Sequence, residues 1–86
     1  MTLAQFGNDY FVEVTLRKHV HGHWIARIPN AEVVIDAQLL PVEFIGASDI
    51  EALNELMTVI ENRELILNGY TQNERRFTVP QLTRLQ

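Results

Sequence analysis

The stretch RKHVHGHWIARIP, residues 17–29, contains the turn and the second strand around which the fold is built. Its second half alternates between two kinds of side chain, which is typical of a β-strand. Gly22 has no Cβ and can adopt the positive φ that a tight hairpin turn requires. We therefore predict a hairpin that turns at His21 and Gly22. Its second strand should end at Pro29, because proline cannot donate a ladder hydrogen bond.

The preceding segment DYFVEVTLRK, residues 9–18, also alternates and predicts the first strand of the hairpin. Its two faces carry Tyr10, Val12, Val14 and Leu16 on one side and Phe11, Glu13, Thr15 and Arg17 on the other. In the second strand, Trp24 is in phase with the apolar positions, which predicts a core position under a helix. If the helix leaves the opposite face uncovered, Phe11 and Ile25 form an exposed apolar pair of the kind that marks partner-binding surfaces.

Three histidines, His19, His21 and His23, lie two residues apart around the predicted turn. On a straight strand all three would share a face and could hold a metal ion. A turn at Gly22 breaks that line and leaves only His19 and His23 facing each other, with no Asp, Glu or Cys close by to complete a site. We therefore favour a solvated hairpin tip. The alternatives are a metal- or ligand-binding site and a pH switch, because imidazole changes its charge near neutral pH.

Two further strand candidates follow this hairpin. The segment AEVVIDAQ, residues 31–38, predicts a third strand, and PVEFIGA, residues 41–47, predicts a fourth. The second segment could also continue the third strand after a kink at Pro41, a residue that favours an edge strand or a bulge. A last short strand is predicted over residues 76–79, where Pro80 ends it.

The segment SDIEALNELMTVIENRELILNG, which begins at Ser48, predicts a long amphipathic helix. Ser48 and Glu51 have the spacing of a capping box, and the apolar residues recur with the period of a helix. We predict one helix over 49–67, stopped by Gly69. The alternative ends the helix near Asn62 and makes the run ELIL a strand.

These elements predict an α+β fold, an antiparallel sheet of three to four strands with one long amphipathic helix packed on one face, in the order ββ(β)αβ. The chain has 86 residues, of which 47% are hydrophobic, and we expect one domain over 1–86 with a modest core. It contains no cysteine, which suits a reducing compartment, and we expect a cytoplasmic protein. No apolar run approaches the length of a membrane span, and no signal peptide is recognised.

The net charge of −4 bears on the kind of partner. The basic residues cluster only at Arg17–Lys18 and Arg75–Arg76, so direct binding to nucleic acid is disfavoured. A basic protein partner suits the charge better, and a homo-oligomer stays open.

Catalytic motifs are not recognised in the chain. The only serine, Ser48, is used as a helix cap, and the strand carboxylates of Glu13, Asp36 and Glu43 are interpreted as solvated groups. The chain also lacks the glycine-rich phosphate loops and the zinc-finger spacing of cofactor-binding proteins. We expect a protein that is not an enzyme and that holds no cofactor.

Two runs resemble the HicB-like antitoxin family. GHWIARIP, residues 22–29, is similar to the family's second strand, and GASDIEALNEL, residues 46–56, to its glycine, Ser or Thr cap, acidic residue and Ala-Leu at the start of a long helix. The resemblance covers about residues 10–80 and implies a degraded RNase H-like fold that masks a small basic ribonuclease toxin. The chain departs from the family in a longer connection over 30–45. The 17 residues after Gly69 are too few for a DNA-binding domain, so we expect no autorepression by this chain alone.

The functional prediction is a non-enzymatic protein-interaction module that acts as a HicB-like antitoxin. Alternatives are a phage- or plasmid-borne acidic inhibitor of a host defence complex, and a metal- or ligand-binding protein that uses the histidines. The predicted partner-binding residues combine the apolar pair with nearby and helical carboxylates; they are Phe11, Glu13, Ile25, Glu51 and Glu55.

Overall fold

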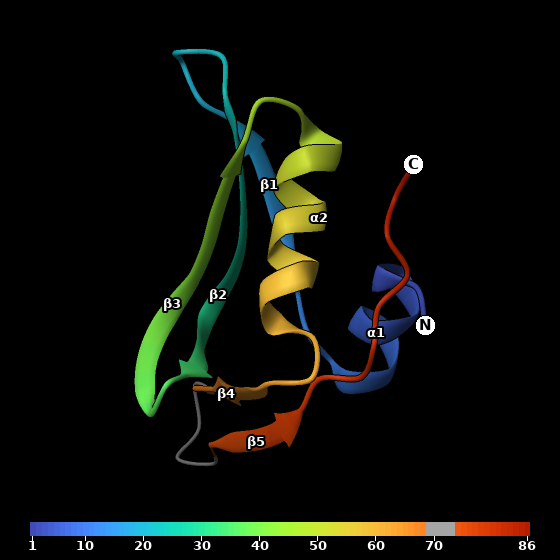
Figure 1. Ribbon diagram of the computed structural model, residues 1–86, viewed down its shortest axis with the longest axis vertical. Coiled ribbons are helices and arrows are strands. Elements are labelled where there is room, and N and C mark those ends of the chain that lie inside the picture. The colour runs from blue at the N-terminus through green and yellow to red at the C-terminus, as the bar shows by residue number, and fades with distance from the viewer. Residues whose placement is uncertain (69–73) are drawn as a thin grey trace.

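The computed structural model describes residues 1–68 and 74–86 (Figure 1). It contains two helices and a five-stranded antiparallel sheet, which confirms the predicted α+β class. In chain order the elements are α1 (Leu3–Tyr10), β1 (Thr15–Lys18), β2 (Trp24–Ile35), β3 (Gln38–Gly46), α2 (Asp49–Ile60), β4 (Glu64–Leu67) and β5 (Arg75–Thr78).

Strand β2 organises the sheet. One of its edges pairs first with β1 and further along with β4, while its other edge pairs with β3. Strand β5 extends the sheet beyond β4. The figure shows β2 and β3 as the two long strands, with α2 lying against them and α1 beyond α2 (Figure 1). The two hairpins β1–β2 and β2–β3 therefore share one central strand.

The predicted end of the second strand at Pro29 is wrong, because β2 continues through the proline to Ile35. The prediction of a separate third strand over 31–38 is wrong for the same reason. The ladder between β2 and β3 shifts register between Arg27 and Glu32, so the missing N–H of Pro29 falls where the ladder is already interrupted. The next residue, Asn30, has a φ of 58°, a left-handed conformation that asparagine tolerates well.

A two-residue turn at Asp36 and Ala37 separates β2 from β3. Both residues have positive φ, 50° and 63°, as the tight turn of a two-residue hairpin requires. Strand β3 therefore begins at Gln38, and the alternative of one strand kinked at Pro41 is wrong. Pro41 lies within β3, which among the described residues pairs only with β2, so the predicted preference of this proline for an edge strand is confirmed.

The predicted helix over 49–67 is wrong in its second part. Helix α2 ends at Ile60, Asn62 adopts a φ of 61°, and the run ELIL forms β4, as the alternative proposed. The N–H of Asn62 donates to the carbonyl of Val79 at 2.8 Å, which ties this turn to the C-terminal segment. Gly69, the predicted stop, lies outside the described residues.

The start of α2 follows the sequence signal. The Ser48 hydroxyl accepts a hydrogen bond from the Glu51 N–H at 3.1 Å, as an N-cap does. The Glu51 carboxylate accepts from the N–H of Ala47 at 2.9 Å, one residue before the position a capping box uses. Gly46 lies so close to this turn that a Cβ there would stand 2.4 Å from the Ala52 nitrogen, so only glycine fits.

Helix α1 is not part of the predicted fold. The first strand was expected to begin near residue 9, but this part of the chain is helical up to Tyr10 and β1 begins at Thr15. Thr2 and Gln5 form a capping box, with the Thr2 hydroxyl accepting from the Gln5 N–H and the Gln5 side chain accepting from the Thr2 N–H.

The core lies between the sheet and the two helices. Trp24, predicted as a core residue, is only partly buried and packs against this core. The largest fully buried side chains come from both helices, two strands and the C-terminal segment; they are Phe6, Leu56, Met57, Ile60, Leu65, Val33 and Val79. In the part of the chain that the structure describes, no helix is long and apolar enough to cross a membrane.

Candidate partner-binding site

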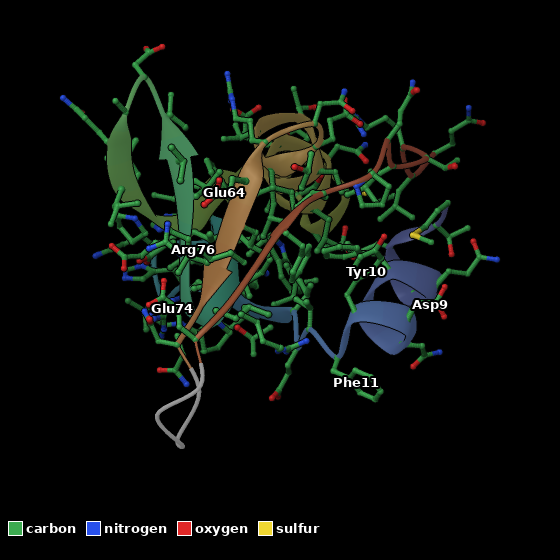
Figure 2. All side chains as sticks on the ribbon, turned by 90° about the horizontal axis from the view of Figure 1, so that it is seen from below. Asp9, Tyr10, Phe11, Glu64, Glu74 and Arg76 are labelled. Carbon is green, nitrogen blue, oxygen red and sulfur yellow. The ribbon has the colours of Figure 1, made fainter. Side chains whose placement is uncertain are left out.

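Phe11 combines two unusual features. Its backbone is left-handed, with a φ of 55°, and its side chain is 82% exposed. For a bulky side chain this conformation costs about 1–2 kcal/mol relative to a right-handed one. Figure 2 shows the phenyl ring projecting away from the fold at the end of α1. The chain thus holds an aromatic ring in solvent at a strained position, which is the kind of outlier that clusters at functional sites.

The neighbouring Tyr10 points the other way and anchors α1. Its ring lies 5.0 Å from the ring of Phe6 and 4.8 Å from that of Phe77 in β5, measured between centroids. Phe6 is fully buried, so this cluster attaches α1 to the core. The reversal between Tyr10 and Phe11 sends one ring inward and the next ring outward.

Arg75 fixes the turn that presents Phe11. Its guanidinium donates to the carbonyl of Tyr10 at 2.6 Å and to the carbonyl of Phe11 at 3.0 Å. The last carbonyls of a helix have no partners within the helix, and a cation there also interacts favourably with the helix dipole. The N–H of Val12 donates to the carbonyl of Gly7 at 3.0 Å and closes the end of the helix.

Phe11 borders a pocket of about 230 Å³, which we call the Phe11 pocket. It lies between the end of α1 and the interruption in β2. Two of its lining residues, Phe11 and Asn30, have left-handed backbone. The Asn68 N–H donates to the Asn30 carbonyl at 2.7 Å and holds this irregular backbone in place. The pocket is lined by Phe11, Val12, Glu13, Ile28, Pro29, Asn30, Leu67, Asn68 and Arg75.

The structure brings only two of the five predicted partner-binding residues together. Phe11 and Glu13 both line the Phe11 pocket. Glu51 and Glu55 are exposed on α2, where Glu51 is used to hold the turn before the helix, and neither lines this pocket.

The predicted exposed pair of Phe11 and Ile25 is wrong, because Ile25 is only 5% exposed. It lies between Arg17 of β1 and Ile45 of β3 in the register of the sheet, and these two flanking side chains point to the same face. Ile25 is thus buried although it lies outside the core cluster under the helices.

A larger apolar pocket of about 480 Å³ lies between α1, β1 and α2. None of the five predicted residues lines it, and its lining includes no charged side chain. The lining residues are Thr2, Leu3, Ala4, Gly7, Val12, Val14, Leu16, Leu53 and Leu85.

The three histidines lie at the tip of the β1–β2 hairpin, and the predicted turn is confirmed. Gly22 has a φ of 96° and donates its N–H to the carbonyl of His19 at 2.9 Å. His19 and His23 face each other with ring centroids 4.3 Å apart and planes 13° apart. Ring nitrogens lie in the plane of the ring, so two rings stacked in this way do not direct both sets of lone pairs at one ion. Among the described residues no group of three His, Cys, Asp or Glu side chains is placed to hold a metal ion.

Two ion-pair groups fix the C-terminal part of the chain. Arg76 of β5 lies between the carboxylates of Glu74 and Glu64 (Figure 2). Its guanidinium nitrogens lie 2.7 Å from a Glu74 oxygen and 3.3 Å from a Glu64 oxygen. These hydrogen bonds and charges raise the pKa of Arg76. Arg84 pairs with Glu61 just after α2, and this hydrogen bond, with a second from the Leu82 N–H, lowers the pKa of the Glu61 carboxyl.

The sequence prediction missed Arg75, Asn30 and Asn68 as parts of the site. The sequence marks Arg75 only as half of a basic cluster, because its partner carbonyls lie 64 and 65 residues away in the chain. One local signal could have indicated an irregular strand. It is the pair Pro29–Asn30, in which a proline is followed by a residue that tolerates left-handed backbone.

No protein family model matches the chain, and no match was found among curated proteins or among solved structures. The resemblance to HicB-like antitoxins therefore stays a hypothesis.

Proposed function

We propose that this protein is a non-enzymatic interaction module that binds a partner protein through the Phe11 pocket and thereby neutralises or regulates it. The resemblance to HicB-like antitoxins suggests a small basic ribonuclease toxin as the partner. The proposal includes a cytoplasmic setting, because a chain without cysteine needs no oxidising compartment to fold.

The observation that carries this proposal is the presentation of Phe11. An exposed ring on strained backbone, fixed by two hydrogen bonds from Arg75, is already in position before a partner arrives. A rigid aromatic side chain loses little conformational entropy on binding, and aromatic residues are enriched among those that dominate the energy of protein interfaces.

Glu13 and the net charge of the chain favour a basic partner, while the other charged lining residue, Arg75, is engaged with the carbonyls of Tyr10 and Phe11. Glu13 lines the same pocket and forms no ion pair with any described residue, while the chain as a whole carries −4. A cationic side chain of the partner next to Glu13 would add a contact at the rim. The net charge would also increase the rate of association at low salt.

The genomic neighbourhood selects the partner to be tested. An adjacent short reading frame for a basic protein supports the antitoxin, and a position among phage genes supports the alternative, an acidic inhibitor of a host defence complex. In the first case the basic protein is produced in cells with and without this chain, and growth is recorded. Growth arrest that this chain does not relieve would refute the antitoxin role.

A matched pair of variants tests the binding site. Phe11→Ala should weaken binding about 30-fold or more, as removal of a central aromatic side chain from an interface costs about 2 kcal/mol. Val20→Ala is the control, because Val20 is 91% exposed at the tip of the β1–β2 hairpin and does not line the pocket. Unchanged affinity of Phe11→Ala, measured by calorimetry with the purified partner, would remove Phe11 from the interface.

A further inference from the structure

Strand β3 lies at an exposed edge of the sheet. In the part of the chain that the structure describes, it pairs with β2 alone, so its other side presents unpaired backbone groups (Figure 1). Natural proteins commonly protect such edges with charged side chains, and a proline such as Pro41 of β3 also weakens an edge. The other edge strands follow this rule, since β1 and β5 each carry two basic residues in four. β3 carries a single charge, Glu43, in nine residues.

The backbone phase of β3 follows from its hairpin. A two-residue turn places Ile35 and Gln38 as the pair that closes the ladder, and the direction of the backbone groups then alternates along the strand. Leu39, Pro41, Glu43 and Ile45 therefore direct their backbone groups away from β2. The position of Pro41 agrees with this phase, because a proline on the outward side removes no bond to β2.

The side chains along this edge are apolar and exposed. Leu39 is 51% exposed and Ile45 62% exposed, and both share the face of the sheet that carries Glu43. Leu40 is also exposed, on the face toward the helices. Apolar side chains thus stand on both sides of an open row of backbone donors and acceptors.

The order of residues in β3 is self-complementary about Val42. Reversal of the segment LLPVEFI places Leu39 opposite Ile45, Leu40 opposite Phe44, and Val42 opposite itself. An antiparallel pair of two such strands therefore matches apolar residues at every position except Pro41 with Glu43. Such cross-strand pairs are the units that stabilise a sheet.

We infer that β3 pairs antiparallel with β3 of a second copy of this chain, with a two-fold axis at Val42, so that two five-stranded sheets become one. The Glu43 N–H donates to the Pro41 carbonyl of the second copy, and Leu39 and Ile45 exchange both of their hydrogen bonds. Neighbouring registers are less favourable. A shift in one direction places Glu43 opposite Glu43, a like-charge pair, and a shift in the other direction places Pro41 opposite Pro41, where neither strand has a donor.

The oligomeric state tests the dimer. Sedimentation of the purified chain over a dilution series should show a monomer–dimer equilibrium, and Ile45→Lys should raise the dissociation constant at least about tenfold, because each dimer loses two apolar contacts between Ile45 and Leu39 and places a charge beside each copy of Leu39. Val20→Lys, at an even more exposed apolar position at the hairpin tip, should leave the equilibrium unchanged. At a concentration of about 1 mM all but very weak dimers should form. A wild-type chain that stays monomeric at that concentration overturns the inference.

Cysteine variants test the register, since the chain has no cysteine of its own. In the inferred dimer the two copies of residue 39 are about 20 Å apart, six residues along the strand, whereas residues 39 and 45 face each other. Leu39→Cys mixed with Ile45→Cys should form a disulfide-linked heterodimer under mild oxidation, while each variant alone should not cross-link. Equal cross-linking of Leu39→Cys by itself would refute the register.

The same variants separate self-pairing from an edge used for another protein. If the chain is monomeric and Ile45→Lys instead loses binding to the partner of the proposed function, β3 takes a strand of that partner and the self-paired dimer is wrong. If Phe11→Ala loses partner binding while the dimer persists, the two surfaces are independent, as the inference requires.

Discussion

The left-handed backbone of Phe11 makes a sharp prediction about stability. At most exposed positions glycine is less stable than alanine by about 0.5–1 kcal/mol, because glycine loses more backbone entropy on folding. At a φ of 55° the order should reverse, since a Cβ costs about 1–2 kcal/mol in this region and glycine has none. The net expectation is that Phe11→Gly is more stable than Phe11→Ala by about 0.5–1 kcal/mol.

The comparison isolates the backbone because both variants remove the same ring, which is 82% exposed and contributes little burial. For a chain of this length about 1 kcal/mol corresponds to about 4–8 °C in Tm, which thermal unfolding followed by circular dichroism resolves. Ala4→Gly in α1 serves as the control, because an exposed helical position should lose about 1 kcal/mol with glycine.

Equal or lower stability of Phe11→Gly than of Phe11→Ala would refute a left-handed residue at this position. If the reversal is observed, the more stable Phe11→Gly variant should still fail to bind the partner. Stability and binding would then change in opposite directions at one residue, as expected where a strained site is kept for function.

Three further outcomes follow from the packing and charge of the fold. Gly46→Ala should destabilise the protein by about 3 kcal/mol or more in urea unfolding, because the new Cβ would meet the Ala52 nitrogen at 2.4 Å; a near-wild-type midpoint would contradict this contact. Leu56→Ala should cost about 2–5 kcal/mol by the same assay, since Leu56 is fully buried. The hydrogen bond from Arg84 lowers the pKa of Glu61 in the folded protein, so this carboxylate contributes stability above its ordinary pKa of 4.5 and loses it as the pH falls below that value. Glu61→Gln should therefore lose less stability between pH 7 and pH 3 than the wild type. An unchanged dependence of stability on pH would exclude a stabilising pair between Glu61 and Arg84.

Local signals predicted the parts of the fold that depend on neighbours in the chain. The turn at Gly22, the cap at Ser48 and the strand that the structure places at Arg75–Thr78 all follow from a few adjacent residues. Each uses chemistry that acts over one to four residues, such as a missing Cβ or a hydroxyl that reaches an N–H.

The errors arose where two local patterns overlapped. Leu67 lies seven residues after Ile60, so it continues the helical period of apolar residues and favours a longer helix. The same apolar run ELIL also fits a buried strand, which is what the structure contains. The alternation that begins at Tyr10 concealed α1, whose cap at Thr2 was the signal that should have been read.

The candidate site was beyond local reasoning. The exposure of Phe11 depends on Arg75, far away in the chain, and the burial of Ile25 depends on its neighbours in two other strands. Alternation gives the face of a sheet on which a residue lies, but it does not give what covers that face.

The interruption in β2 should also allow two parts of the sheet to open at different times. Strand β1 and strand β4 follow one another along the same edge of β2, and the irregular backbone around Asn30 lies between them. Amide protons in the β1–β2 ladder and in the β2–β4–β5 ladder can therefore be released by separate openings rather than by one. Native-state hydrogen exchange should resolve two groups of amides with different protection, and the boundary between them should fall at Asn30, within what is a single continuous strand.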